Sequence, residues 1–150
     1  MWSRETKIRR DRFGVWFDGE EPIDQPAIAR AFDRWLELAD DGRFCLKNSV
    51  NWAYVQIEGA PVFVRQAHRR VEGFALDLSD GRQEDLDPAT LAIDAEGAIH
   101  CRVRGGTLWA RFDHPAALSL GEAVVEDEGA LWLMLSGVRW PFALGLSIGK

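Results

Sequence analysis

The sequence predicts an α+β fold of duplicated strand–helix–strand units with mainly antiparallel sheets. Two segments, 26–39 and 115–125, have apolar residues at helical spacing and a proline in the first turn. Around them lie short apolar runs separated by Asp-Gly, Glu-Gly and Gly-Gly turns, a pattern typical of antiparallel strands. The signals that bound the two helical segments recur about 88 residues apart, which indicates an internal repeat.

The first predicted helix, 26–39, has one apolar and one polar face. Asp24 stands at the N-cap, and Pro26 occupies the first turn, where its missing N–H costs nothing. The apolar stripe consists of Ile28, Phe32, Trp35, Leu36 and Ala39. The face expected to contact water consists of Arg30, Asp33, Arg34 and Glu37. Gly42 is expected to adopt a left-handed conformation and to end the helix.

The second predicted helix, 115–125, repeats this arrangement with Asp113 as its cap and the segment 126–129 as its end. Before the first helix, Asp18-Gly19 between apolar runs predicts a β-hairpin. The predicted strands are 44–46, 53–58, 62–64, 74–78, 91–93, 98–103, 107–111, 131–135 and 139–144. Residues 4–12 form a basic N-terminal arm, which we expect to be a solvated leading segment.

The repeat rests on three matched features. Asp24-Gln25-Pro26-Ala27 opens the first helix and Asp113-His114-Pro115-Ala116 the second. Gly42 and Gly129 follow the two helices, and a Val-x-Trp triplet follows each next strand, as Val50-Asn51-Trp52 and Val138-Arg139-Trp140. The chain is therefore predicted to consist of an N-terminal repeat unit, 1–60, and a C-terminal repeat unit, 61–150. A seam between two such halves is a common place for a binding pocket.

These segments resemble the bacterial family called domain of unknown function 1285. The resemblance runs from about Phe13 to Phe142 and is carried by the segments 14–17, 19–23, 55–64, 103–112 and 135–142. It implies a duplicated α+β core, a C-terminal half superficially like a pleckstrin-homology fold, a site between the halves, and a role in signalling or regulation. Ser49-Val50-Asn51-Trp52 stands where the family has Pro-Val-Glu-Lys, so contacts of that Glu–Lys pair do not carry over.

Composition restricts the classes of partner. The chain of 150 residues has a formal net charge of -6, and a uniformly acidic protein is repelled by nucleic acid backbones and anionic membranes. No apolar run approaches the roughly 20 residues of a membrane span. Two cysteines do not make a disulfide framework, and residues 1–12 contain no apolar signal-peptide core. We therefore expect a cytoplasmic protein without a membrane partner.

No catalytic or metal-binding constellation is present in the sequence. His100 and Cys101 are neighbours on a predicted strand, so their side chains point to opposite faces and do not form a nucleophile–base pair. The three histidines, His68, His100 and His114, show no metal-ligand spacing, and no phosphate-binding loop occurs. We therefore predict no catalytic residue, no metal and no cofactor.

A ligand site is predicted at the seam between the repeats. The repeat-matched residues that would line it are Asn51, Trp52, Arg139 and Trp140. Asn51 and Arg139 would make polar contacts with the ligand, and the two indoles would form an apolar wall. Arg111 and His114 would add positive charge near the start of the second helix, which suits an acidic or planar ligand. Arg65, Arg69 and Arg70 form a separate candidate anion site.

The leading functional hypothesis is a non-enzymatic binding or regulatory module for a small molecule, a protein or a peptide. One alternative is a small hydrolase-type enzyme that uses carboxylates with His100 or His114. Another is nucleic-acid binding through the basic arm and the 65–70 cluster, which the acidic net charge disfavours.

Overall fold

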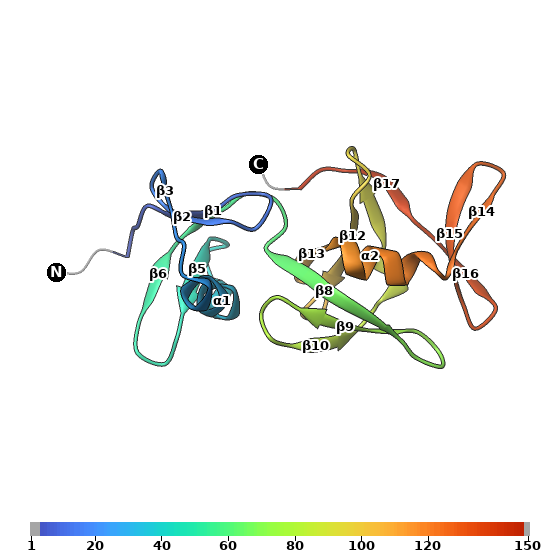
Figure 1. The fold of residues 1–150 in the computed structure, drawn as a ribbon, viewed down its shortest axis with the longest axis horizontal. Coiled ribbons are helices and arrows are strands. Elements are labelled where there is room, and N and C mark those ends of the chain that lie inside the picture. Colours follow the sequence, from blue (N-terminus) through green and yellow to red (C-terminus); the bar gives the residue numbers. More distant parts are fainter. Residues whose placement is uncertain (1–3, 149–150) are drawn as a thin grey trace. The chain divides into compact units, whose positions relative to one another are not determined.

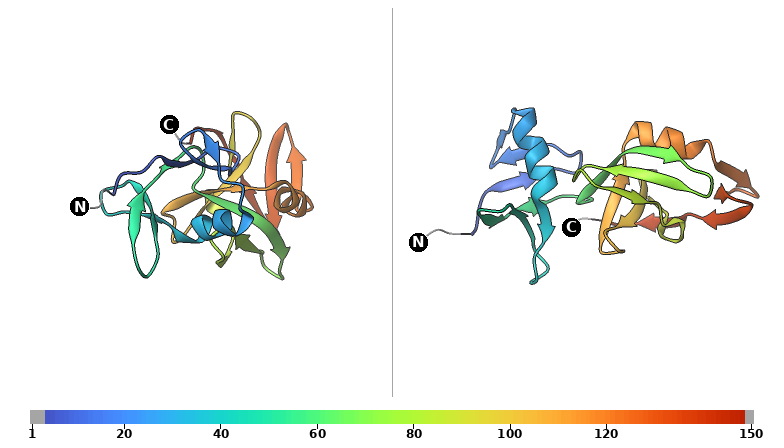
Figure 2. Two further views of the ribbon diagram at one scale, coloured as in Figure 1. Left: turned by 60° about the vertical axis from the view of Figure 1, so that its left-hand side comes forward. Right: turned by 90° about the horizontal axis from the view of Figure 1, so that it is seen from below.

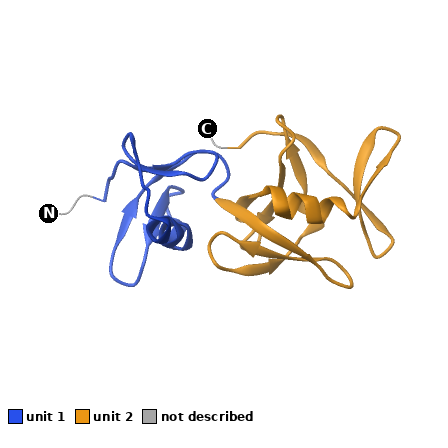
Figure 3. Cartoon of the chain, in the orientation of Figure 1, with its two compact units in different colours: residues 1–61, 149–150 blue, residues 62–148 orange. Residues whose placement is uncertain are grey.

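The chain separates into two units after Pro61 (Figure 3). The structure is a computed structural model that describes residues 4–148. Unit 1 is described over residues 4–61, and unit 2 is Val62–Ile148. No helix within the described residues is both long and apolar enough to cross a membrane.

Unit 1 contains one helix and two small sheets (Figure 1). The first sheet has the order β3-β2-β1-β7 and the second has the order β4-β5-β6. Helix α1 packs on β5 of the second sheet (Figure 2). The elements are β1 (Ile8–Arg10), β2 (Trp16–Asp18), β3 (Glu21–Pro22), α1 (Pro26–Trp35), β4 (Leu36–Leu38), β5 (Phe44–Lys47), β6 (Trp52–Tyr54) and β7 (Gln56–Ile57).

Unit 2 contains a seven-stranded sheet, a helix and a three-stranded sheet. The large sheet has the order β10-β9-β8-β13-β12-β11-β17, α2 lies along β8, and the small sheet is β14-β15-β16 (Figures 1 and 2). The elements are β8 (Val62–Arg69), β9 (Phe74–Leu78), β10 (Gln83–Asp85), a 3-10 turn (Pro88–Thr90), β11 (Ala92–Asp94), β12 (Ile99–Val103), β13 (Leu108–Phe112), α2 (His114–Gly121), β14 (Val124–Asp127), β15 (Ala130–Leu135), β16 (Val138–Pro141) and β17 (Ala143–Leu146).

The α+β class and the mainly antiparallel pairing predicted from the sequence are confirmed. Among the strand pairs of the described residues, β1 with β7, β13 with β8 and β11 with β17 are parallel and the others are antiparallel. The hairpin at Asp18-Gly19 is confirmed by the pairing of Asp18 with Glu21, and Gly19 takes the positive φ of 62° that this tight turn needs. The duplication and the likeness to a pleckstrin-homology fold stay predictions.

Both helices end earlier than the sequence predicts. Helix α1 stops at Trp35, because residues 36–38 pair with β5 as strand β4. Helix α2 stops at Gly121, because Val124 and Val125 enter strand β14, where β-branched side chains pack well. Gly42 and Gly129 therefore do not end helices. They lie with positive φ in the turns that lead from β4 to β5 and from β14 to β15.

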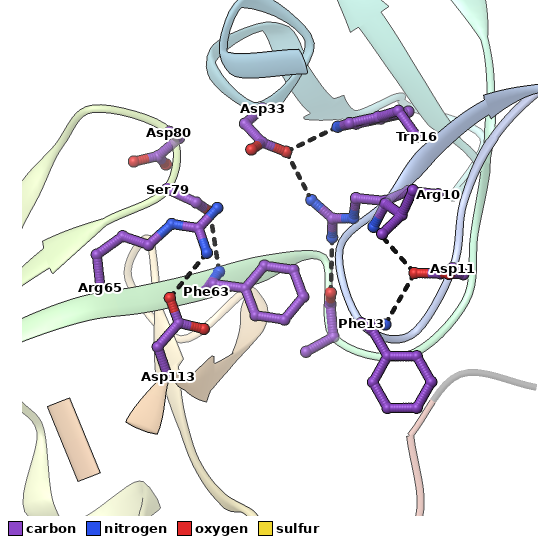
Figure 4. Close-up of polar contacts among 12 residues, drawn as sticks. Arg10, Asp11, Phe13, Trp16, Asp33, Phe63, Arg65, Ser79, Asp80 and Asp113 are labelled. Atoms are coloured by element: carbon purple, nitrogen blue, oxygen red, sulfur yellow. Dashed lines mark hydrogen bonds and ion pairs between the residues drawn. The ribbon is translucent and has the colours of Figure 1, made fainter. Parts of the chain in front are cut away.

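The predicted caps are also corrected. Gln25, and not Asp24, holds the N-cap position of α1, and it makes no side-chain cap bond. Asp113 does hold the N-cap position of α2, but its carboxylate makes no cap bond either. Instead Asp113 Oδ2 accepts a hydrogen bond of 2.7 Å from Arg65 Nη1 (Figure 4).

The polar face predicted for α1 is wrong at Asp33. This residue is 7% exposed, whereas Ile28 of the predicted apolar stripe is 44% exposed. The helix is rotated by about one residue relative to the prediction, so that Ala29, Phe32 and Asp33 face inward together with Leu36 of β4. A carboxylate in this position requires partners, since an unpaired buried charge is strongly unfavourable.

Asp33 receives those partners from two earlier segments. Its Oδ1 accepts hydrogen bonds from Arg10 Nη1 at 3.0 Å and from Trp16 Nε1 at 2.9 Å (Figure 4). Arg10 is 0% exposed, and its Nη2 donates to the carbonyl oxygen of Ala60 at 2.7 Å. The prediction of a solvated N-terminal arm is therefore wrong at Arg10, which ends strand β1 inside unit 1.

The apolar core of unit 1 surrounds this pair. Trp16, Leu36, Leu46 and Val55 form its buried centre. Trp16 and Phe32 meet edge to face with ring centroids 5.3 Å apart, a favourable aromatic geometry. Partly buried side chains close the core around them: Ile8, Ile23, Ala29, Phe32, Trp35, Phe44 and Ile57.

Unit 2 has its own apolar interior and its own buried ion pair. Val64, Leu76 and Ala110 of the large sheet and Leu120 of α2 are fully buried. The buried Asp80 accepts hydrogen bonds from Arg104 Nε at 3.0 Å and Nη2 at 2.8 Å. This pair joins the turn after β9 to the turn after β12.

Removal of the Asp33 carboxylate should destabilise the protein by about 3–5 kcal/mol, because it leaves the buried Arg10 charge without its counter-ion. We expect that loss for Asp33→Ala in urea unfolding. The double variant Arg10→Met/Asp33→Leu should lose less, since it leaves no unpaired charge. Asp24→Ala is the matched control and should change stability by no more than about 0.5 kcal/mol. Equal losses for Asp24→Ala and Asp33→Ala would contradict this assignment.

A second prediction tests the apolar face of α1. Phe32→Ala should cost about 3 kcal/mol, the low end for a core phenylalanine, because the ring is partly exposed. Arg34→Ala, on the exposed side, should stay within about 0.5 kcal/mol. Chemical denaturation of both variants measures the two losses. If the two losses are similar, the face of α1 has been misassigned.

Candidate functional site

The small sheet β4-β5-β6 of unit 1 has one face in the core and one face outside it. Side chains alternate between the faces of a strand, and directly paired residues share a face. Leu36, Leu46 and Ala53 are paired in one row, and the first two belong to the core. The neighbouring rows therefore point outward, and they carry the side chains of a pocket.

Two cross-strand rows form the wall and floor of this pocket. Glu37 of β4 pairs with Cys45 of β5, which pairs with Tyr54 of β6. Two residues further along β5, Lys47 pairs with Trp52. These five side chains line a pocket of about 370 Å³. Its rim is the segment 38–41, where β4 turns toward β5.

The aromatic side chains of the pocket are held in place from outside. The rings of Trp52 and Tyr54 meet edge to face with centroids 5.1 Å apart. The guanidinium of Arg4 lies over the Trp52 ring at 4.5 Å, and that of Arg43 lies over the Tyr54 ring at 3.6 Å. Cation–π contacts of this kind restrain both partners, so the aromatic wall is preformed.

Hydrogen bonds fix the acidic rim. The Tyr54 hydroxyl donates to Asp41 Oδ2 at 2.6 Å, and the backbone N–H of Arg43 donates to Asp41 Oδ1 at 3.1 Å. The hydrogen bond from Tyr54, and after it the one from the Arg43 amide, lowers the pKa of Asp41 below 3.8. The same Tyr54–Asp41 hydrogen bond raises the pKa of Tyr54 above 10.0. Asp41 is therefore ionised and Tyr54 is neutral at physiological pH.

An ion pair with Glu5 anchors Arg43. Its two terminal nitrogens donate to the two carboxylate oxygens of Glu5, each at 2.7 Å. This bidentate pair lowers the pKa of Glu5, chiefly through the hydrogen bond from Arg43. The Arg43 guanidinium thus forms an ion pair with Glu5 and also lies over the Tyr54 ring.

Cys45 on the pocket floor is a protonated thiol at neutral pH. The residue is 4% exposed. Burial raises its pKa above 9.0, and the nearby carboxylate of Glu37 raises it further. The other cysteine, Cys101, is fully buried in β12 and burial raises its pKa to about 12. Neither thiol has the lowered pKa that nucleophilic catalysis needs.

The predicted site residues of unit 1 lie close together. Arg4 Nη1 donates to Asn51 Oδ1 and to the carbonyl oxygen of Trp52, both at 2.5 Å. Trp52 lines the pocket, whereas Asn51 is exposed and holds Arg4 in place beside it.

The predicted site residues of unit 2 have other neighbours. Arg139 Nη1 donates to Asp127 at 2.9 Å, and the guanidinium lies over Trp132 at 5.5 Å. Trp140, the next residue of β16, points to the opposite face of its strand and pairs with Leu133. Arg111 is half-buried in β13, and His114 is the exposed first residue of α2. The prediction that these residues share one site with Asn51 and Trp52 stays a prediction.

The arginines of the predicted anion site lie on β8, as Arg65 and Arg69, and directly after it, as Arg70. Arg65 is paired with Asp113 at 2.7 Å and lies over Phe63. Arg69 lies over Phe74 with 5.4 Å to the ring centroid, and Arg70 Nη1 is 3.5 Å from the Arg69 carbonyl oxygen. The charge of Arg65 is already matched by a carboxylate. Anion binding by the three stays a prediction.

The enzyme alternative gains little from the surroundings of His100, one of its two histidines. His100 is 3% exposed, with Nδ1 3.2 Å from the Ala98 carbonyl oxygen and 3.9 Å from Asp94 Oδ2. Such burial leaves little room for a substrate to reach the ring. Within residues 4–148, no three side chains of His, Cys, Asp or Glu are placed to hold a metal ion.

The comparisons with known proteins give the fold. A scan of family models and a search of curated proteins found no match. A DUF1285 family protein from Silicibacter pomeroyi DSS-3 has 23% sequence identity and a TM-score of 0.68, with 93% of this chain and 80% of that chain covered. A DUF1285 family protein from Shewanella baltica OS155 has 18% identity and a TM-score of 0.59, with 80% and 94% covered. The resemblance predicted from the sequence is confirmed at the level of the fold.

Sequence reasoning found one pocket residue, Trp52, and missed its neighbours. The missed residues are the segment 37–41, Cys45, Lys47 and Tyr54. The alternation of apolar and other residues through Phe44-Cys45-Leu46-Lys47 was the available signal, since it separates a core face from an outer face.

The buried His100 makes stability depend on pH in a defined window. Burial lowers its pKa below 6.5, against the opposing effects of the Ala98 carbonyl and Asp94. The unfolded chain binds a proton near pH 6.5 and the folded chain does so only at lower pH, so stability should fall as pH drops below 6.5. We expect this fall in urea unfolding at pH 5–8 to be smaller for His100→Gln. Parallel pH profiles of the two proteins would contradict the assignment.

Proposed function

We propose that this protein is a non-enzymatic binding module whose small-molecule site is the pocket on the outer face of β4-β5-β6. The observation that carries the proposal is the pocket of about 370 Å³ with Trp52 and Tyr54 held against each other beside charged side chains. That volume lies within the range of about 300–1,000 Å³ typical of ligand sites.

Preorganisation of the walls supports binding at this place. Arg4 and Arg43 restrain the two aromatic rings, and the Tyr54–Asp41 bond fixes the rim. A site whose side chains are already ordered does not spend binding free energy on ordering them. The pocket therefore has the property that favours tight binding of a small ligand.

The chemistry of the lining favours binding over catalysis. Cys45 is a protonated thiol, and the Tyr54 hydroxyl is engaged by Asp41. The bond to Asp41 raises the pKa of Tyr54, and burial together with the Glu37 carboxylate raises that of Cys45, so the surroundings of both groups oppose formation of the anionic nucleophile.

A repeated arrangement of elements supports extending the proposal to a regulatory role. In each unit a helix is followed by a three-stranded antiparallel meander, α1-β4-β5-β6 in one and α2-β14-β15-β16 in the other. The shared order supports the duplication predicted from the sequence. With the same arrangement present twice, one copy would bind the ligand and the other would contact a protein partner. Such a division agrees with the regulatory role that the family resemblance implies.

The site can be tested by a fragment screen on the full chain. We expect fragments that bind to shift the indole N–H signal of Trp52 and the amide signals of residues 37–47 in nitrogen-15 NMR spectra. Trp52→Ala should abolish the shifts of the amide signals of residues 37–47. Trp140→Ala, the repeat-matched control, should leave them intact, and amide dispersion reports whether each variant is folded.

The same screen defines what would refute the proposal. Fragment shifts that survive Trp52→Ala but disappear in Trp140→Ala would place the site in unit 2. A screen in which no fragment shifts any signal of the pocket would remove the proposed function altogether.

A further inference from the structure

We infer that the pocket takes a small zwitterion, with its ammonium at the rim and its carboxylate at the Lys47 end. This inference rests on the proposed function and concerns the arrangement of charge within the same pocket. Its basis is that the acidic and basic side chains of the lining are separated along the strands.

The acidic end is the rim with the strand next to it. Asp40 and Asp41 lie in the turn after β4, and Glu37 lies on β4 itself, facing the pocket. Asp41 is held by a hydrogen bond to each of its oxygens, from Tyr54 and from the Arg43 amide. A carboxylate has about four lone-pair sites, so Asp41 keeps acceptor capacity for an ammonium group.

The basic end is the row of Lys47 and Trp52. Lys47 lies two residues beyond Cys45 on β5, which separates the two rows by about 7 Å along the strand. The guanidinium of Arg4 adds positive charge there, because it lies over the Trp52 ring and is fixed by Asn51. A carboxylate is the group that such an end attracts.

The middle of the pocket is apolar. The Cys45 thiol is uncharged, and on β5 it lies between the rim turn and Lys47, with Tyr54 in its own row and Trp52 in the next. A short methylene chain fits this stretch, since it buries apolar surface without leaving a polar group unpaired. The ligand class is therefore an ω-amino acid or a dipeptide of similar length, with charges several ångströms apart.

A matched set of ligands tests the charge arrangement by calorimetry on the full chain. The probes are 6-aminohexanoate, hexylamine and hexanoate, which share a chain and differ in their charged ends. We expect 6-aminohexanoate to bind at least tenfold more tightly than either of the others. Glycine, which is too short to reach both ends, should bind more weakly than 6-aminohexanoate.

Variants separate the two ends. Lys47→Met should lower the affinity for 6-aminohexanoate about tenfold and should not lower the affinity for hexylamine. Glu37→Gln/Asp40→Asn should weaken 6-aminohexanoate and hexylamine by a similar factor. Glu20→Gln removes an exposed negative charge of unit 1 outside the pocket, and it should change the affinity for neither ligand.

The failures of the inference and of the proposed function are distinguishable. If hexylamine or hexanoate binds as tightly as 6-aminohexanoate and shifts the Trp52 indole signal, the pocket is a site and the zwitterion assignment is wrong. The assignment is equally wrong if 6-aminohexanoate does not bind while other fragments reach the pocket. If no small molecule shifts the pocket signals, both the proposed function and the zwitterion assignment are wrong.

Discussion

The buried carboxylate of Asp33 ties together three segments of unit 1 that are distant in the sequence. It comes from α1, and its hydrogen bonds reach Arg10 at the end of β1 and Trp16 at the start of β2. Arg10 in turn binds the carbonyl oxygen of Ala60, at the end of the unit. Because an unpaired charge in this core would be strongly unfavourable, these partners specify how α1 is rotated against the first sheet.

The rotation of α1 determines which face of β4-β5-β6 lies outside the core. With Phe32 and Asp33 directed inward, Leu36 and Leu46 follow into the core. Strand alternation then places Glu37, Cys45 and Tyr54 on the other face. The pocket is thus a consequence of the same packing that buries the ion pair, and its floor is a thiol whose burial keeps it protonated.

The pocket is built from contacts that would each contribute little if isolated. Exposed ion pairs such as Glu5–Arg43 stabilise a fold only weakly. Here the arginine also covers an aromatic ring, and the ring hydroxyl holds the rim carboxylate. The arrangement positions charged groups along a short apolar floor, which gives the site a direction that a uniformly charged pocket would lack.

The sequence by itself determined the class of the fold and the start of each helix. Pro26 and Pro115 lie in the first helical turns, the Asp18-Gly19 hairpin is present, and antiparallel pairing dominates, because these features depend on local backbone preferences. The resemblance to the DUF1285 family likewise holds at the level of the fold.

Only the tertiary structure decided where the helices end, that Asp33 and Arg10 are buried, and which residues share the pocket. Residues 36–38 have helical periodicity in the sequence, yet pairing with β5 makes them a strand. In the sequence Asp33 does not differ from other polar residues on a helix, because its burial depends on Arg10, which lies 23 positions earlier in the chain. The rows Glu37–Cys45–Tyr54 and Lys47–Trp52 follow from the register of three paired strands, and the first row requires residues 36–38 to be a strand, whereas their spacing in the sequence favours a helix.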